Sequence, residues 1–175
     1  MPDETRSPSA ADAADSAELD PRLDNVLFDV WLVSRATTAL LDEALRGSGL
    51  DSDEFAIYSV LASTEHMTPT ELARWMSAPP TTVSSYVKRL EQRDHIVKTP
   101  NPDDGRSYRL SLTPAGRSAH RIAGALFLPI LDTVRDRIGD EASDTHRRLR
   151  DLHRHIEALT RVQQLRPDGN GRPEG

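Results

Sequence analysis

The feature of this sequence that most constrains its fold is a change in the period of its apolar residues near residue 95. Over residues 23–93 apolar side chains recur at the three- and four-residue spacing of helices, and the same spacing returns after residue 113. Between these segments, residues 96–112 contain two short runs with strand character, separated by a turn rich in proline, aspartate and glycine. A β-hairpin enclosed by helices predicts a mostly α (α+β) fold.

Local start and stop signals divide the helical segments. Gly47 and Gly49 end a first helix that begins near residue 23, and one of residues 51–53 caps a second. A third helix begins at Thr68, with Glu71 at the capping-box position. The other expected elements are a helix from about 80 to 93, strands over 96–99 and 107–112, a helix from 113 to about 138, and a last helix after Gly139.

The net charge of −6 is concentrated near the N-terminus. Residues 1–24 contain seven acidic and two basic residues, a net of −5, so the other 151 residues carry only −1. Residues 80–112 contain six basic residues against four acidic ones. The charge of the whole chain therefore neither supports nor rejects binding to nucleic acid.

Both ends of the chain have the composition of disordered segments. Residues 1–21 predict an acidic, disordered N-terminal tail, and the Gly/Pro-rich residues 166–175 predict a disordered C-terminal tail. The sequence contains neither a signal peptide nor an apolar run long enough for a membrane, so we expect a cytoplasmic protein with no membrane partner. The lack of cysteine excludes disulfides, thiolate metal sites and thiol redox switching.

The helix expected over residues 80–93 has faces of different chemistry. Val83, Val87 and Leu90 recur at the spacing of one buried face. Hydroxyl-bearing and basic side chains occupy the rest, a pattern that suits a helix in the major groove of DNA but equally an ordinary solvated face. The candidate DNA-binding residues on this helix are Thr81, Thr82, Ser84, Ser85, Tyr86, Lys88 and Arg89.

Several motifs at consistent mutual spacing carry a resemblance to a known family. They are Leu72-Ala73, Thr82-Val83-Ser84, Arg89-Leu90-Glu91, Asp103-Asp104-Gly105-Arg106 and Leu112-Thr113-Pro114-Ala115-Gly116. Together they resemble the multiple antibiotic resistance regulator (MarR) family over roughly Leu23 to Leu165. The resemblance implies one domain over residues 22–165, with a winged helix-turn-helix core at about 52–112 and dimerisation helices at about 22–46 and 113–165.

The resemblance also implies how such a chain works. Two copies form a homodimer through the terminal helices, the fourth helix enters the major groove of double-stranded DNA, and the hairpin wing reaches the minor groove. Arg106 is then the wing arginine, and Asp104 is the aspartate that orders the wing by charge pairing. Arg106 suits the role physically, because an arginine at a turn tip is always charged and a narrow minor groove concentrates negative potential. The alternative is a surface arginine paired with Asp103 or Asp104.

This sequence departs from the family pattern at four points. Pro79 replaces the serine that usually caps the recognition helix, and Ser85 replaces an arginine often found there. Asp94-His95 stands in place of a Gly-Leu pair that ends the helix, and Asn101 in place of a wing aspartate. Because aspartate can take the left-handed conformation at some cost, we expect the turn at Asp94 to survive.

Family members commonly bind small aromatic ligands in a crevice beside the dimerisation helices. The candidate side chains for binding an aromatic or anionic effector are Phe28, Trp31, Arg35, Phe55 and Tyr58. The alternative is that the aromatic residues belong to the core and that Arg35 is solvated.

No catalytic motif is recognisable, and we expect neither an enzyme nor a cofactor. The chain has six histidines, which are His66, His95, His120, His146, His153 and His155. Only His146 and His153 share a helix face, and these two are interpreted as surface residues and not as a metal site.

Two functional hypotheses follow. The first is a sequence-specific DNA-binding transcriptional regulator, a ligand-responsive repressor that binds a pseudo-palindromic operator as a homodimer. The alternative is a protein–protein adaptor with the same fold that has lost DNA binding, which the near-neutral charge, Pro79 and Ser85 motivate.

Overall fold

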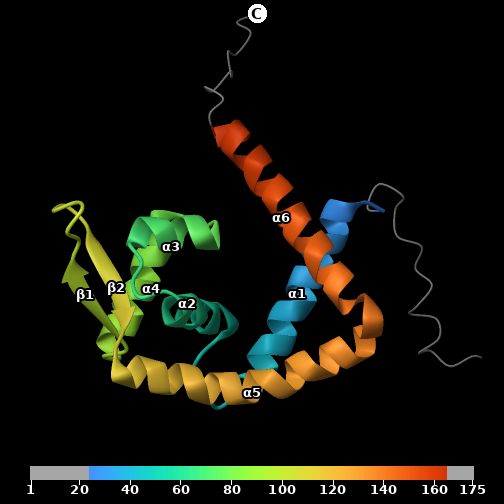
Figure 1. Ribbon diagram of the computed structural model, residues 1–175, viewed down its shortest axis with the longest axis horizontal. Helices are drawn as coiled ribbons and strands as arrows, with labels where there is room; N and C mark the ends of the chain where they lie inside the picture. Colours follow the sequence, from blue (N-terminus) through green and yellow to red (C-terminus); the bar gives the residue numbers. More distant parts are fainter. Residues whose placement is uncertain (1–23, 165–175) are drawn as a thin grey trace, which may run out of the picture. The chain divides into compact units, whose positions relative to one another are not determined.

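The computed structural model describes residues 24–164, and the tails predicted at residues 1–21 and 166–175 lie outside them. The elements occur in the order that the sequence predicts (Figure 1). They are α1 (Val26–Ala44), α2 (Ser52–Ser63), α3 (Pro69–Met76), α4 (Pro80–Gln92), β1 (Ile96–Pro100), β2 (Tyr108–Leu112), α5 (Pro114–Ile138), the 3₁₀ turn η2 (Gly139–Glu141) and α6 (Ala142–Gln164).

The helix caps confirm the local signals. The side chain of Asp51 accepts the backbone N–H of Glu54 at 2.7 Å and so begins α2. At α3, Thr68 and Glu71 form both halves of the capping box, with Glu71 Oε2 2.7 Å from the backbone nitrogen of Thr68. Gly47, with a φ of 89°, takes the left-handed conformation in the turn that follows α1. Such short-range hydrogen bonds depend on neighbouring residues alone, which is why the sequence predicts them.

The two strands form the expected antiparallel hairpin. Their register pairs Ile96 with Leu112 and Pro100 with Tyr108. The structure adds an antiparallel bridge that the sequence does not predict. The backbone of Met67, between α2 and α3, exchanges hydrogen bonds of 3.1 and 2.7 Å with that of Leu110 in β2. This contact ties the hairpin to the start of α3, so the hairpin is attached to the helices at more than its own two ends.

The core of the first part of the chain is built from α2, α3, α4 and the hairpin. The α2 helix contacts β2 and α1, α3 packs against α4 and β2, and α4 contacts β1. The three residues predicted for the inner face of α4, Val83, Val87 and Leu90, are each at most 2% exposed. The expected inner face of this helix is therefore confirmed.

The structure divides into two units at Gly124, within α5. The second unit contains the end of α5, η2 and α6, and several of its large apolar side chains are exposed. The α1 helix of the first unit likewise has no buried residue. None of the helices in residues 24–164 combines the length and the apolarity that a membrane crossing requires.

Candidate nucleic-acid interface

The outer surface of α4 carries most of the candidate DNA-binding side chains. Thr81, Thr82, Ser84, Ser85 and Lys88 are all exposed. The hydroxyl of Ser85 donates to the Thr81 carbonyl at 3.0 Å, so one of its hydrogen-bonding positions is already taken within the helix. The helix begins at Pro79 without a side-chain cap, as the departure from the family pattern predicted.

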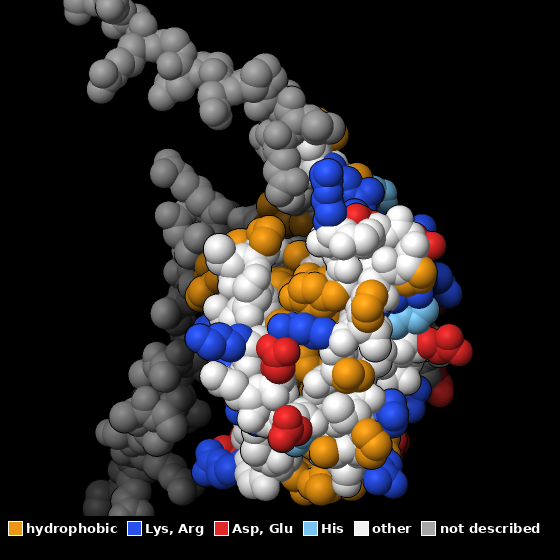
Figure 2. Space-filling model, turned by 90° about the vertical axis from the view of Figure 1, so that its left-hand side faces the viewer, with side chains coloured by type: hydrophobic (Ala, Val, Ile, Leu, Met, Phe, Trp, Pro, Cys, Tyr) orange, Lys and Arg blue, Asp and Glu red, His pale blue; other side chains and the backbone are white. Residues whose placement is uncertain are grey.

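A shallow hollow runs along this surface. Its volume is about 580 Å³, and it is lined by Thr82, Ser85, Tyr86, Lys88, Arg89 and Gln92, all from α4. Figure 2 shows the side of the molecule on which the hairpin lies, where lysine and arginine side chains stand in separate places between acidic ones. A continuous basic patch is therefore not visible on that face. Any contact of this face with DNA would therefore depend on where a few individual side chains are placed.

Two of the candidate residues, Tyr86 and Arg89, turn toward α2. The hydroxyl of Tyr86 donates to Asp53 Oδ2 at 2.7 Å, and the Arg89 guanidinium lies over the Tyr86 ring, 4.7 Å from its centroid. Burial, together with the hydrogen bond to Asp53, raises the pKa of Tyr86 to about 12, so the phenol remains a proton donor. The sequence placed both residues with the outward-facing candidates. Both line the hollow, and the structure in addition brings them to the seam between α4 and α2.

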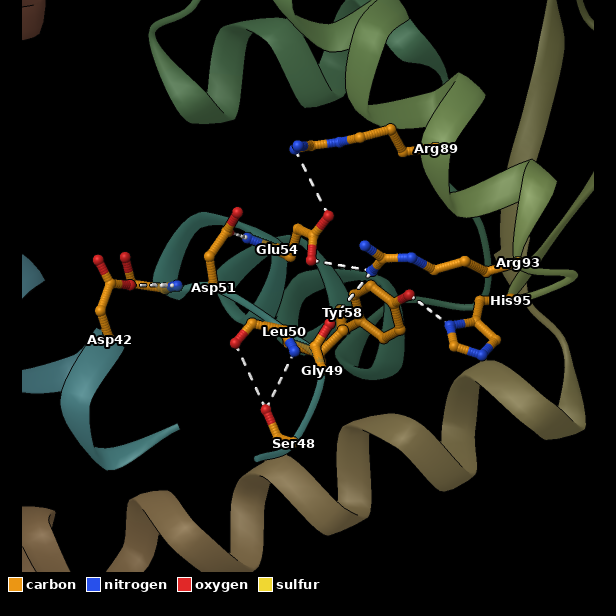
Figure 3. A network of polar contacts seen from close by, with 11 residues as sticks. Asp42, Ser48, Gly49, Leu50, Asp51, Glu54, Tyr58, Arg89, Arg93 and His95 are labelled. Atoms are coloured by element: carbon orange, nitrogen blue, oxygen red, sulfur yellow. Dashed lines mark hydrogen bonds and ion pairs between the residues drawn. The ribbon is translucent and has the colours of Figure 1, made fainter. Parts of the chain in front are cut away.

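The seam is centred on Glu54, which sequence reasoning missed. Its side chain is 2% exposed, and Oε2 accepts a hydrogen bond of 3.0 Å from Nη1 of Arg93 (Figure 3). Its other oxygen, Oε1, lies 3.5 Å from Nη2 of Arg89. The hydrogen bond to Glu54 raises the pKa of Arg93. The only sequence signal was the run of acids in the first turn of α2, which helix capping alone explains.

A second polar contact lies close to this seam. The Tyr58 hydroxyl is 2.6 Å from Nδ1 of His95, and the tyrosine is fully buried. Burial raises the pKa of Tyr58 to about 12. His95 follows Asp94, whose φ of 55° is the left-handed conformation expected at this departure from the Gly-Leu pair.

Two of the other histidines contact core residues of the first unit. His95 contacts Tyr58, and the ring of His120 stacks on Phe55 with centroids 5.6 Å apart. His120 Nε2 also lies 3.1 Å from the Ser59 hydroxyl. Both histidines satisfy polar groups inside the first unit, a role that spacing along the chain does not reveal. Within residues 24–164, no cluster of His, Asp and Glu has the arrangement of a metal site.

The wing is ordered by different pairs from those the resemblance implied. The Asp104 carboxylate accepts the backbone N–H of Arg106 at 3.0 Å, whereas the ion pair of the wing joins Asp103 to Arg109 at 2.6 Å. Asn101 supports that pair, because its Oδ1 accepts from Arg109 Nε at 3.0 Å. The Arg106 side chain is exposed and belongs to none of the ion pairs of the described residues. The alternative role for this arginine, a surface ion pair with Asp103 or Asp104, is not observed.

The candidate effector residues are not gathered on one surface. Phe28 and Trp31 stack on α1 with centroids 5.8 Å apart, and Trp31 is 56% exposed; Arg35, one turn later, is also exposed. Phe55 and Tyr58 belong to the core of the first unit. For Phe55 and Tyr58 the alternative stated above, that the aromatic residues belong to the core, is therefore correct.

Comparison with known proteins agrees with the resemblance to the MarR family, both in sequence and in fold. The sequence model of the MarR family matches residues 48–107, which include α2, α3, α4, β1 and the wing turn. A search of curated protein sequences finds no significant match.

Solved structures match most of the chain. The transcriptional regulator MosR of M. tuberculosis, in complex with DNA, is 24% identical; the match covers 78% of this chain and 98% of that one, with a TM-score of 0.68. A mutant of MarR from E. coli, complexed with operator DNA, is 18% identical with the same coverage and TM-score. A probable transcriptional regulator from Pseudomonas aeruginosa is 26% identical over 76% of this chain and 97% of that one, with a TM-score of 0.61.

Proposed function

Because this chain belongs to the MarR family of winged helix-turn-helix regulators, we propose that it binds double-stranded DNA as a homodimer and represses transcription. The observation that carries this proposal is the pairing of two exposed elements in one unit. The α4 helix presents threonine, serine and lysine outward, and the wing presents an arginine without an ion-pair partner among the described residues. Hydroxyl groups can reach base edges or phosphates, while the cations meet the backbone and the minor groove.

Each element has a distinct part in this proposal. Thr81, Ser84 and Ser85 face the major groove, Lys88 binds a phosphate, and Arg106 enters the minor groove. The homodimer forms through the terminal helices, whose exposed apolar side chains a second copy would cover. The target is a pseudo-palindrome, because two copies related by a two-fold axis place their recognition helices about 34–36 Å apart, one turn of DNA.

We propose that an aromatic effector of this regulator contacts α1 and not the core. Phe28 and Trp31 offer a stacked aromatic surface, and Arg35 offers a cation one turn away. The chain has two tryptophans, so quenching of Trp31 fluorescence can be followed in a Trp75→Phe variant. Quenching by an aromatic carboxylate that also releases DNA would support this role. Release of DNA without quenching would refute it.

The alternative of an adaptor that has lost DNA binding is not favoured. The features that motivated it were Pro79, Ser85 and the small net charge, yet α4 forms without its usual cap and keeps its polar face exposed. Two of the structural neighbours were solved in complexes with DNA, although their low identity relates them to this chain by fold.

The test of the proposal is selection of duplexes from a random-sequence library by the full-length chain, followed by fluorescence anisotropy. A DNA-binding regulator should select a pseudo-palindrome, and its affinity should fall steeply as salt rises, because phosphate contacts release counterions. Failure to enrich any sequence, with no retention on DNA at low salt, would reject DNA binding and favour the adaptor.

A further inference from the structure

The side chain of Glu54 joins α2 to the DNA-facing helix through two arginines of unequal position. Arg93, in the residue after α4, makes the short contact, with Nη1 3.0 Å from Glu54 Oε2. Arg89, one turn earlier, makes the longer one, with Nη2 3.5 Å from Oε1. Figure 3 shows the carboxylate between the two guanidinium groups, which approach it from the side of α4.

The carboxylate is held where an unpaired charge would be costly. Glu54 is 2% exposed, and its Oε1 accepts no hydrogen bond within the described residues, so the nearby charge of Arg89 is what compensates it. A buried carboxylate without a partner is strongly destabilising, whereas a well-packed apolar side chain at such a site is often tolerated as well as the ion pair. The ion pairs of Glu54 are therefore not explained by a gain in folding stability. We look instead for a side chain whose orientation depends on Glu54.

Arg89 is such a side chain. Its guanidinium is restrained by the Tyr86 ring at 4.7 Å and by the carboxylate of Glu54. Tyr86 is itself anchored to Asp53 by a hydrogen bond of 2.7 Å. The Arg89 side chain remains 47% exposed and borders the hollow along α4. Three residues of two helices thus orient one arginine that still reaches the outer surface.

We propose that Glu54 is a positioning residue for DNA recognition, which holds Arg89 in the orientation required by a specific sequence while Arg93 neutralises the remainder of the buried charge. This inference rests on the proposed function. Without Glu54 the Arg89 side chain would keep its charge but lose its fixed direction, and a flexible cation binds any phosphate nearly equally well. Glu54 therefore contributes to discrimination between sequences more than to affinity.

The test compares the affinities of Glu54→Gln for two duplexes, the one selected by the wild-type protein and a scrambled duplex of equal length and composition. We expect the ratio of specific to non-specific affinity to fall about tenfold, the size of one mismatched base pair. The decrease should come from loss of the preference for the selected duplex, because the removed negative charge favours binding to both duplexes alike. Glu65→Gln removes the same charge from an exposed glutamate that is in none of the described ion pairs, and it should leave the ratio unchanged.

A double-mutant cycle shows whether Glu54 acts through Arg89. In an Arg89→Ala background, Glu54→Gln should have little further effect on the ratio, since the group that it positions is gone. An unchanged ratio in Glu54→Gln, or the same decrease with and without Arg89, would overturn the inference. If the wild-type protein selects no sequence at all, the proposed function itself fails, which is a separate result.

Folding of the variants is followed by circular dichroism and thermal unfolding. Should Glu54→Gln fail to fold, Arg89→Lys tests the same idea at an exposed position. Lysine keeps the positive charge but lacks the planar fork that can lie on Tyr86 and contact Glu54 together. If Glu54 positions the Arg89 guanidinium, Arg89→Lys should lower the ratio of specific to non-specific affinity. If Arg89 only contacts a phosphate, the ratio should stay at the wild-type value.

Discussion

The backbone carbonyl of His95 lies so close to Gly116 that a Cβ at position 116 would be only 2.1 Å from the carbonyl oxygen. The same oxygen accepts the backbone N–H of Thr113 at 3.0 Å. The start of β1 and the start of α5 therefore meet at a point where no side chain fits. This junction fixes the base of the wing against the helix that follows it.

Replacement of Gly116 by alanine should destabilise the protein by about 1–3 kcal/mol or more, the range of overpacked buried sites, because backbone atoms have to move. The measurement is urea unfolding followed by circular dichroism. Gly124→Ala is the matched control in the same helix, since a Cβ there meets nothing within 4 Å. The control should be neutral or slightly stabilising, as alanine favours a helix more than glycine does. Equal effects of the two changes would contradict the close approach at His95.

Arg106→Ala should weaken binding to the selected duplex by about tenfold or more, since an arginine in a narrow minor groove lies in concentrated negative potential. The dependence of the affinity on salt should become shallower by about one ion. Anisotropy titrations at several salt concentrations measure both effects. Arg46→Ala, which removes an exposed arginine paired locally with Glu43, is the control and should bind as the wild type does. Wild-type binding by Arg106→Ala would remove the wing from the interface.

Thr68→Ala should lower the free energy of unfolding by about 1 kcal/mol, because the capping box of α3 loses its side-chain acceptor. Thr68 Oγ1 accepts the backbone N–H of Glu71 at 3.2 Å, and this bond disappears in the variant. Denaturant titration measures the change. The exposed Thr70, within the same helix, provides the comparison, and its replacement by alanine should change stability by less than about 0.5 kcal/mol.

The contact of His120 with Phe55 and Ser59 should make stability depend on pH. Burial lowers the pKa of His120 below its ordinary value of 6.5, so the unfolded chain takes up a proton before the folded one does. This contribution is fully present above the unfolded pKa and is lost as pH falls from 6.5 toward the lower folded pKa. Unfolding at a series of pH values between about 8 and 5 should therefore show a shallower decrease for His120→Gln than for the wild type. His66→Gln, at an exposed site, should keep the wild-type slope.

Leu159→Asp on α6 should weaken self-association. Leu159 is 66% exposed in the isolated chain, and we expect a second copy to cover it. A charge placed in such an interface should raise the dimer dissociation constant at least about tenfold, which sedimentation velocity over a range of concentrations measures. Thr160→Asp places the same charge on the neighbouring exposed position and should leave the association unchanged. A monomeric wild-type chain would refute the proposed homodimer.

The sequence was sufficient for the features that depend on neighbouring residues. The capping box of α3, the left-handed Asp94 and the buried face of α4 all involve groups within a few positions of one another. Their hydrogen bonds and apolar spacing follow from local geometry, which each short segment carries with it. The α4 surface and the exposed arginine of the wing belong to this class as well.

Only the tertiary structure decided which polar side chains meet. Glu54 contacts Arg93, 39 positions later, and Tyr58 contacts His95, 37 positions later. In the sequence, Glu54 is one more acid at a helix start, and Arg89 is one more cation on a polar face. Their partnership arises because hydrophobic packing of Val83, Val87 and Leu90 sets the rotation of α4, and that rotation brings the next face of the helix onto the first turn of α2. Apolar burial is not directional and requires only spacing, whereas an ion pair requires two groups to be placed within a few ångströms by the whole fold.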